Sequence, residues 1–213
     1  STDFLNNTVN SQGGFLAFNL FGGTIGNATD AAYGPNHQGI WLVRSSTSQN
    51  SGYGALTQTG SVMLAPNMTF DSCFRTPAVF TNNLVRLGHS DASNATAPAN
   101  GAWLTLNADI VTGNTASAST GSATATLYTL AASTWYHTRV TVNSTITSIL
   151  YEIYSDSGTL LGSASLTTNI PTSTSTRLRT GFLATNSQTT VVDIINMDYM
   201  ELKIPGLQRG ALV

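Results

Sequence analysis

The chain has 213 residues, enough for one large domain, and only 8% of them are charged. Thr, Ser and Asn supply 74 residues, and the β-branched Thr favours strands, so the composition excludes a mostly helical protein. The eight Lys and Arg residues are scattered and the net charge is −2, which excludes duplex nucleic acid and a polybasic membrane patch. Apolar runs are far shorter than the roughly 20 residues that span a bilayer, so we expect no membrane insertion.

The first half is expected to alternate short strands with polar loops. Residues 1–14 are predicted to form an N-terminal arm, 15–204 a single β-sandwich domain and 205–213 a C-terminal tail. Apolar clusters predict strands at 40–44, 62–64, 68–74, 84–87, 103–106 and 123–130. Turn-forming residues predict loops at 26–39, 45–54, 88–101 and 112–122, with Gly88 breaking the strand before it.

The second half has the clearest pattern. Strict alternation over 134–142 and 146–154 is typical of half-buried antiparallel strands. In the first of them it predicts that His137 lies on the outer face beside Arg139. Asp156-Ser157-Gly158 predicts a turn, and a third strand begins at Thr159. These segments predict a three-stranded meander. A strand over 178–184 and a long final strand over 189–204, with a bulge, are expected to follow.

No window shows a helical spacing, so we expect helix in less than roughly 10% of the chain, well below the usual third. Strands separated by turn residues every 10 to 15 positions are typical of a two-sheet antiparallel sandwich or jelly roll. The predicted fold class is therefore an all-β sandwich.

The order of strand and turn motifs resembles a known family. The motifs are Arg86–Asp91, Asn100–Leu104, Trp135-Tyr136, Leu150–Tyr154, Asp156–Gly158, Asn169–Pro171, Thr180–Phe182 and Asp198–Leu202. Together they resemble the concanavalin A-like lectin/glucanase sandwich, especially the versions in bacteriophage tail fibres and other virion proteins. The resemblance covers about residues 40–204. It implies binding to a glycan or host surface within an oligomeric fibre, often a trimer.

The sequence argues against catalysis. Glucanases of this family carry a Glu-x-Asp-x-x-Glu strand, and the spacing of Asp193, Asp198 and Glu201 does not match it. Such enzymes need two carboxylates, one ionised and one protonated, across a sugar. The chain has three histidines and no Gly-x-Ser-x-Gly elbow for a nucleophilic serine. We therefore expect a protein that is not an enzyme.

No cofactor and no obligatory metal are expected. His89 and Asp91 offer two possible ligands, and Asp109 or Asp156 could supply oxygen to Ca²⁺, which takes six to eight such ligands. Legume-type lectins of the family use Ca²⁺ and Mn²⁺, but their carboxylate-rich loop is missing here. The single cysteine, Cys73, lies among apolar residues and is expected to be a buried, unreactive thiol.

Glycan binding is expected from loops that combine aromatic rings with hydrogen-bonding groups. Three segments hold that mixture: 33–41, 49–54 and 86–103. The candidate ligand-binding residues are Tyr33, Asn36, His37, Tyr53, His89, Asp91 and Asn94. The alternative is that these groups stabilise turns, that Trp41, Trp103 and Trp135 are core residues, and that Arg86 and Asp91 form a structural ion pair.

The leading hypothesis is a non-enzymatic virion domain that recognises a host cell-surface glycan. A neutral polar surface suits an extracellular or virion particle, and a homo-oligomer, with a trimer favoured, is the expected assembly. The first alternative is a structural capsid-decoration or fibre-assembly module without a ligand, using an apolar patch that includes Leu207, Ala211, Leu212 and Val213. The second alternative is a glycan-cleaving enzyme with two converging carboxylates.

Overall fold

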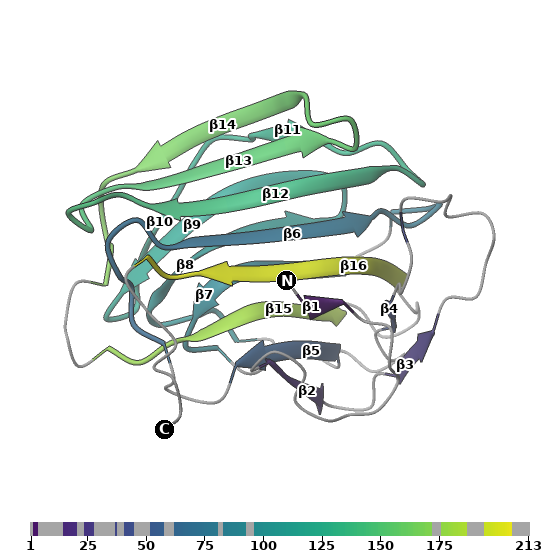
Figure 1. Ribbon diagram of the computed structural model, residues 1–213, viewed down its shortest axis with the longest axis horizontal. Helices are drawn as coiled ribbons and strands as arrows, with labels where there is room; N and C mark the ends of the chain where they lie inside the picture. The colour runs from purple at the N-terminus through teal and green to yellow at the C-terminus, as the bar shows by residue number, and fades with distance from the viewer. Residues whose placement is uncertain are drawn as a thin grey trace, which may run out of the picture.

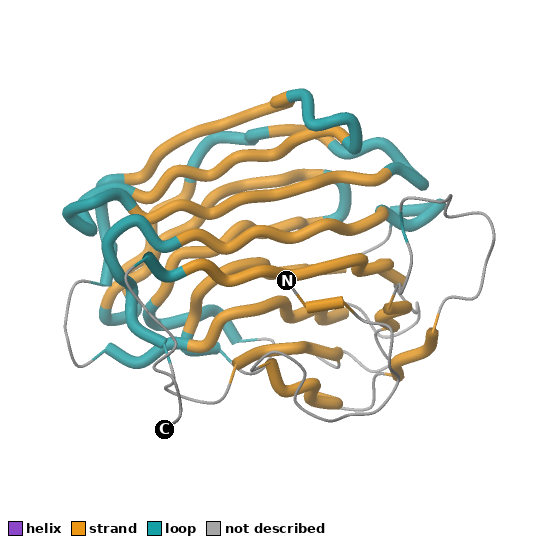
Figure 2. The backbone as a smooth tube through the Cα atoms, in the orientation of Figure 1, coloured by secondary structure: helices purple, strands orange, loops and turns teal. Residues whose placement is uncertain are grey.

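The chain folds into two antiparallel β-sheets that pack face to face (Figure 1). The computed structural model describes residues 2–3, 15–20, 24–27, 37, 41–44, 52–57, 62–80, 83–92, 96–171, 176–186 and 194–205. Strands and loops make up all of these residues, as Figure 2 shows by colour. Within the described ranges, no helix is long and apolar enough to cross a membrane.

One sheet, here named sheet A, contains the meander and the final strand. Its strands in spatial order are β14 (Leu160–Leu166), β13 (Ile149–Ser155), β12 (Trp135–Val142), β6 (Thr69–Arg75), β16 (Ile194–Lys203), β4 (Trp41–Arg44) and β3 (Thr24–Asn27). A short strand, β1 (Thr2–Asp3), also pairs with β16. In Figure 1, β14, β13, β12, β6 and β16 follow one another from top to bottom.

The opposite sheet, sheet B, is also antiparallel. Its strands in spatial order are β10 (Thr120–Ala123), β9 (Ile110–Ser117), β8 (Gly101–Asn107), β7 (Asn83–Ser90), β15 (Arg179–Asn186), β5 (Gly52–Thr57) and β2 (Phe15–Leu20). β11 (Tyr128–Thr129) pairs with β9. Neighbours in this order that are distant in the sequence, such as β7 and β15, give the jelly-roll character expected from the sequence.

The core lies between the two sheets and is built by strand alternation. Every second residue of a strand points inward, and in both sheets most of these positions are apolar. Sheet A contributes mainly aromatic and branched side chains: Phe70, Phe74, Tyr136, Val140, Ile149, Tyr151 and Ile153. Sheet B contributes smaller residues with one large ring: Val85, Leu87, Leu104, Leu106, Val111 and Phe182. The all-β sandwich predicted from the sequence is confirmed.

The predicted meander is confirmed as β12, β13 and β14, which pair in that order. The bulge predicted for the last strand is also present. Between Met197 and Tyr199 the pairing with β6 shifts by one residue, which leaves Asp198 as the extra residue. After the bulge, Met200 takes the buried position that strict alternation would have given to Tyr199.

Several predictions in the first half were wrong. β7 continues through Gly88 to Ser90, because Gly88 pairs with Trp103 and a Cβ there would crowd the backbone of β8. The predicted loop at 112–122 is the hairpin of β9 and β10. Conversely, Val62 forms only an isolated bridge with Leu178, and the predicted strand 123–130 is reduced to β11.

Candidate functional site

The outer face of sheet A carries two rows of polar side chains that cross three neighbouring strands. In the first row, Asp71 of β6 lies between Arg139 of β12 and Glu201 of β16, because it pairs with both. In the next row, Cys73 lies between His137 and Tyr199, again from β12, β6 and β16. Directly opposite side chains on one sheet face are within contact distance. The two rows therefore gather six chemically active groups on one surface.

A depression of about 390 Å³ opens over these rows. Its walls combine charged, aromatic and hydrogen-bonding groups, which include Asp71, His137, Arg139, Tyr154, Asp156 and Tyr199. Tyr154 comes from the outer face of β13, and Asp156 comes from the turn between β13 and β14 that the sequence predicted. The volume lies at the small end of the range of ligand pockets, about 300–1,000 Å³.

Asp71 is the electrostatic centre of the first row. Its buried carboxylate accepts a hydrogen bond from Arg139 Nε at 2.5 Å and lies 3.4 Å from Lys203 Nζ. Lys203 Nζ also contacts Glu201 Oε2 at 2.9 Å. The hydrogen bond with Asp71 raises the pKa of Arg139, and the contact with Lys203 lowers the pKa of Glu201. The Glu201 carboxylate is therefore held ionised beside Lys203.

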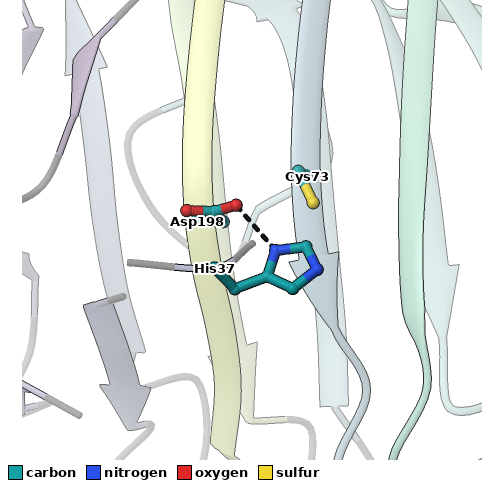
Figure 3. Close-up of side chains that lie close together, drawn as sticks. All are labelled: His37, Cys73 and Asp198. Carbon is teal, nitrogen blue, oxygen red and sulfur yellow. Dashed lines mark hydrogen bonds and ion pairs between the residues drawn. The ribbon is translucent and has the colours of Figure 1, made fainter. Parts of the chain in front are cut away.

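A second cluster lies at the edge of the depression, where His37 meets the bulge of β16. His37 Nδ1 lies 2.8 Å from Asp198 Oδ2, and Nε2 lies 3.1 Å from Asp156 Oδ1. The ring stacks on Trp135, with centroids 3.8 Å apart and planes 10° from parallel. Figure 3 shows that His37 and Asp198 lie beside Cys73 on the adjacent strand.

The second row continues this cluster. His137 Nε2 lies 3.8 Å from Cys73 Sγ and 3.4 Å from Asp156 Oδ1, and its Nδ1 lies 3.1 Å from the Tyr199 hydroxyl. Burial raises the pKa of the Cys73 thiol well above its ordinary value, and the nearby carboxylates add to the shift. Burial also raises the pKa of Tyr199 to about 12. The thiol is therefore not activated as a nucleophile, which requires a lowered pKa.

Among the residues expected from the sequence to bind a ligand, the three whose side chains are described, His37, His89 and Asp91, do not share one site. His37 reaches the cluster just described. His89 was expected in a loop, and this was wrong: it lies on β7, fully buried, with Nδ1 2.8 Å from Thr180 Oγ1. Asp91 holds its own loop together by accepting hydrogen bonds from Ala99 N and Asn100 Nδ2.

The other candidates lie wholly or partly outside the described residues. Tyr33, Asn36 and Asn94 fall outside them, and for Tyr53 only the backbone of β5 is described. Trp103 and Trp135 are buried, as the alternative interpretation expected, but Trp135 is stacked under His37 instead of lying in the main core. The roles proposed for these residues stay predictions.

Sequence reasoning missed most of the site. Period-two alternation correctly placed His137 and Arg139 on the outer face of their strand. Asp71 and Cys73 were seen only as parts of a mainly apolar strand. Their partners lie more than 60 residues away in the sequence, so no local pattern could bring the rows together.

A second hollow, of about 360 Å³, lies at the outer face of sheet B. It is lined by Trp103 of β8, by Asn114 of β9 and by Pro98 from the loop before β8. Trp103 Nε1 and Asn114 Nδ2 both donate to Thr105 Oγ1. This hollow contains part of the segment 86–103 that the sequence selected, and it is a second possible position for a ligand.

The two packed antiparallel sheets have the concanavalin A-like lectin/glucanase fold. More narrowly, the chain belongs to the family described as SO2946-like, C-terminal domain, whose model matches residues 36–198. No curated protein matches the chain in sequence.

Three solved structures illustrate the likeness. The protein of unknown function SO2946 from Shewanella oneidensis MR-1 has a TM-score of 0.79 and 21% identity, covering 94% of this chain and 83% of that one. Peanut lectin has a TM-score of 0.57 and 11% identity, and the match covers 89% of this chain and 98% of the peanut lectin chain. A putative beta-glucanase from Mycobacterium abscessus has a TM-score of 0.51 and 10% identity, and the match covers 78% of this chain and 76% of that one. Lectin-like carbohydrate-binding proteins thus share the fold.

Proposed function

We propose that the protein binds a glycan, without cleaving it, in the depression on the outer face of sheet A. The observation that carries this proposal is the pair of polar rows beneath that depression. Sugars present many hydroxyl groups, which donate and accept hydrogen bonds, together with apolar ring faces. Arg139 and Asp71 supply donors and acceptors, and Tyr154 and Tyr199 supply aromatic rings with hydroxyl groups. The lectin-like fold supports the same assignment.

The rigidity of the site supports binding. Arg139 and Asp71 belong to neighbouring strands and are already paired, so their positions are fixed before a ligand arrives. A preorganised site loses less conformational entropy on binding. Asp156 is half exposed and lies in a turn above the sheet, where it can accept hydrogen bonds from sugar hydroxyls at the rim.

Ion pairing in the first row supports binding over hydrolysis. Asp71 and Glu201 are adjacent carboxylates, the arrangement on which a glycosidase depends, but Lys203 contacts both of them. A glycosidase needs one of its two carboxyl groups to keep its proton, which requires a raised pKa. The pKa of Glu201 is lowered instead. This pair is therefore poorly suited to act as a general acid.

The biological setting forms a further part of the proposal. A surface rich in Thr, Ser and Asn and poor in charge supports an extracellular or virion-associated protein. In that setting the ligand is a host cell-surface glycan, and the chain acts as an attachment domain within a homo-oligomer, with a trimer favoured. Multi-angle light scattering of the full chain tests the assembly: a mass three times that of the monomer is expected, and a monomer contradicts it.

A glycan array tests the binding proposal directly. The wild-type chain is expected to bind a defined glycan group, and Arg139→Ala and Tyr154→Ala are expected to lose at least tenfold in affinity. Arg177→Ala is the matched control, because Arg177 is exposed and lies outside the lining of the depression. Circular dichroism checks that each variant is folded.

The same experiment separates the alternatives. Equal affinity of the wild type and both site variants would show that the glycan binds elsewhere, for example in the hollow beside Trp103. Absence of binding across the array supports a structural module. Mass spectrometry of the best-binding oligosaccharide after incubation is expected to show it intact, and shortened products would establish an enzyme.

A further inference from the structure

His37, Cys73 and Asp198 bring three different metal-binding atoms together at the edge of the depression. One ring nitrogen of His37, the sulfur of Cys73 and a carboxylate oxygen of Asp198 all lie within 4.8 Å of one another. All three residues are buried, and Figure 3 shows their side chains converging from the bulge of β16, the adjacent β6 and position 37. No sequence motif indicates this cluster, because the three positions are far apart in the chain.

We propose that this cluster binds one Zn²⁺ ion, with His137 Nε2 as the fourth donor. Zinc in proteins is held by sulfur, nitrogen and carboxylate oxygen, usually four atoms in a tetrahedron with bonds of about 2.0–2.3 Å. Such bonds place the donor atoms about 3.5 Å apart. His137 Nε2 lies 3.8 Å from Cys73 Sγ but outside the group of three donors that lie within 4.8 Å of one another, so its ring must move toward His37 and Asp198 to complete the site.

The chemistry of the donors selects the metal. Ca²⁺, which the lectin resemblance implies, takes six to eight oxygen ligands, and a cluster of one thiol, two imidazoles and one carboxylate does not fit it. A thiolate and imidazoles favour a borderline metal such as zinc. A thiolate and a carboxylate also balance the two positive charges of the ion, which lowers the cost of burying all three.

The groups around the donors hold them in place. Metal-bound histidines usually donate the second ring N–H to a neighbouring group, which fixes the ring. His137 Nδ1 lies 3.1 Å from the Tyr199 hydroxyl, and His37 Nε2 lies 3.1 Å from Asp156 Oδ1. Trp135 stacks on the His37 ring and limits its rotation. The cluster therefore has the supporting shell that a metal site requires.

An entry path is present as well. His137 and Asp156 both line the open depression, and their side chains are partly exposed. An ion can therefore reach the buried thiol from the solvent side of sheet A. The proposal does not depend on glycan binding, because none of its donors was assigned a role in holding the sugar.

Metal titration of the full chain tests the proposal. The protein is dialysed against a chelator and titrated with Zn²⁺ in competition with a chromophoric chelator, and one equivalent is expected to bind. Cobalt(II) is then used as a spectroscopic probe, because a cobalt–thiolate bond gives a charge-transfer band in the near ultraviolet. That band is expected in the wild type.

The variants assign the ligands. Cys73→Ser is expected to abolish the cobalt–thiolate band, and His37→Gln and Asp198→Asn to weaken Zn²⁺ binding at least tenfold. Asp109→Asn, which changes a carboxylate outside the cluster, is expected to bind as the wild type does. Circular dichroism of the metal-free variants separates loss of ligands from loss of fold, and Cys73→Ala replaces Cys73→Ser if the latter is unfolded.

Two results would overturn the proposal. One is the absence of stoichiometric Zn²⁺ binding by the folded wild-type protein. The other is a cobalt spectrum without the thiolate band, or with a band that is unchanged in the folded cysteine variant. Neither result bears on the glycan proposal, because the array measures glycan binding through Arg139 and Tyr154, which are not metal donors in this proposal.

Discussion

His89 is a buried ionisable residue that the depression does not use. It shares the inward face of β7 with Val85 and Leu87, and its ring packs edge-on against Phe70. Nδ1 meets Thr180, while Nε2 has no hydrogen-bond partner among the described residues. Burial lowers the pKa of His89 to about 3. The folded protein therefore keeps this ring neutral at any ordinary pH.

The buried histidine predicts acid sensitivity. In the unfolded chain His89 takes up a proton below its ordinary pKa of about 6.5, whereas in the folded chain it does so only near pH 3. The stability is therefore complete above about pH 6.5 and falls between there and pH 3, by at most about 1.4 kcal/mol per pH unit. In urea denaturation at a series of pH values, His89→Gln is expected to reduce this slope.

Thr180→Val is the matched variant for this prediction. It removes the hydrogen-bond partner of His89 and is expected to lower the free energy of unfolding by about 1 kcal/mol at neutral pH. It keeps the histidine, so the pH dependence of stability is expected to remain. An equal pH slope in the wild type and His89→Gln would show that His89 does not control the acid response.

Residue placement could be predicted only where the pattern was local. His137 and Arg139 were placed correctly because their own strand alternates without interruption. His89 was misplaced because Gly88 was interpreted as the end of a strand, although Val85, Leu87 and His89 continue the alternation across it. Cys73 was correctly expected to be buried, but its neighbours His37 and Asp198 depend on long-range folding.

Among the elements, β9 and β13 show how closely the two sheets approach. Gly113 of β9 faces Tyr151 of β13, and a Cβ at position 113 would collide with the tyrosine ring. The Tyr151 hydroxyl also donates to the carbonyl of Asn114, at 2.5 Å. A large ring in one sheet thus requires a glycine in the other.

Gly113→Ala is therefore expected to destabilise the fold by about 1–3 kcal/mol, the usual cost of overpacking a core. Gly121→Ala is the control in the paired strand β10, because a Cβ there meets only ordinary contacts. Chemical denaturation measures both. Equal stability of the two variants would mean that the sheets separate easily at this point.

The bulge in β16 determines which side chains face the depression. Asp198 is the extra residue, and beyond it Met200 points inward while Glu201 stays on the outer face. If Asp198 were paired as part of a regular strand, alternation from Met197 would turn Tyr199 and Glu201 toward the core. The bulge thus both supplies the Asp198 carboxylate to the cluster and keeps the first row outside.

Deletion of Asp198 is expected to remove the bulge without turning a charged residue inward, because Met197 and Tyr199 already pair with the consecutive residues Phe74 and Cys73. Its cost in the free energy of unfolding is expected to match that of Asp198→Ala, about 1–3 kcal/mol, because both variants remove the carboxylate that bonds His37. Thermal unfolding compares the two variants. A deletion that destabilises the protein far more than Asp198→Ala would contradict the assignment of Asp198 as the extra residue.

Strands were predicted well where apolar and polar residues alternate strictly, and poorly where glycine and other small residues interrupt the alternation. β12 and β13 carry apolar residues at their buried inward positions with the single exception of Thr138, so both strands could be predicted. β9 has Gly113 and Thr115 at inward positions, and its small residues resemble a turn region. The strand forms because it pairs with β8 from Ile110 to Ala116, and a local sequence pattern does not reveal this pairing.

At the scale of the whole molecule, the fold brings many of the few ionisable residues together on one face. The chain has only 18 acidic and basic residues, and many of them meet on the outer face of sheet A, together with two of the three histidines and the single cysteine. The sandwich could be predicted from composition and strand spacing. The candidate site on the outer face of sheet A could not be predicted in this way, because its rows join strands from both halves of the chain.

The central claim is that this face binds a glycan. The most direct measurement is the crystal structure of the full chain with the best oligosaccharide from the array. We predict a sugar ring in the depression, in hydrogen-bond contact with Arg139 and packed against Tyr154. A sugar bound beside Trp103 on sheet B, or at any site away from these two residues, would contradict the account.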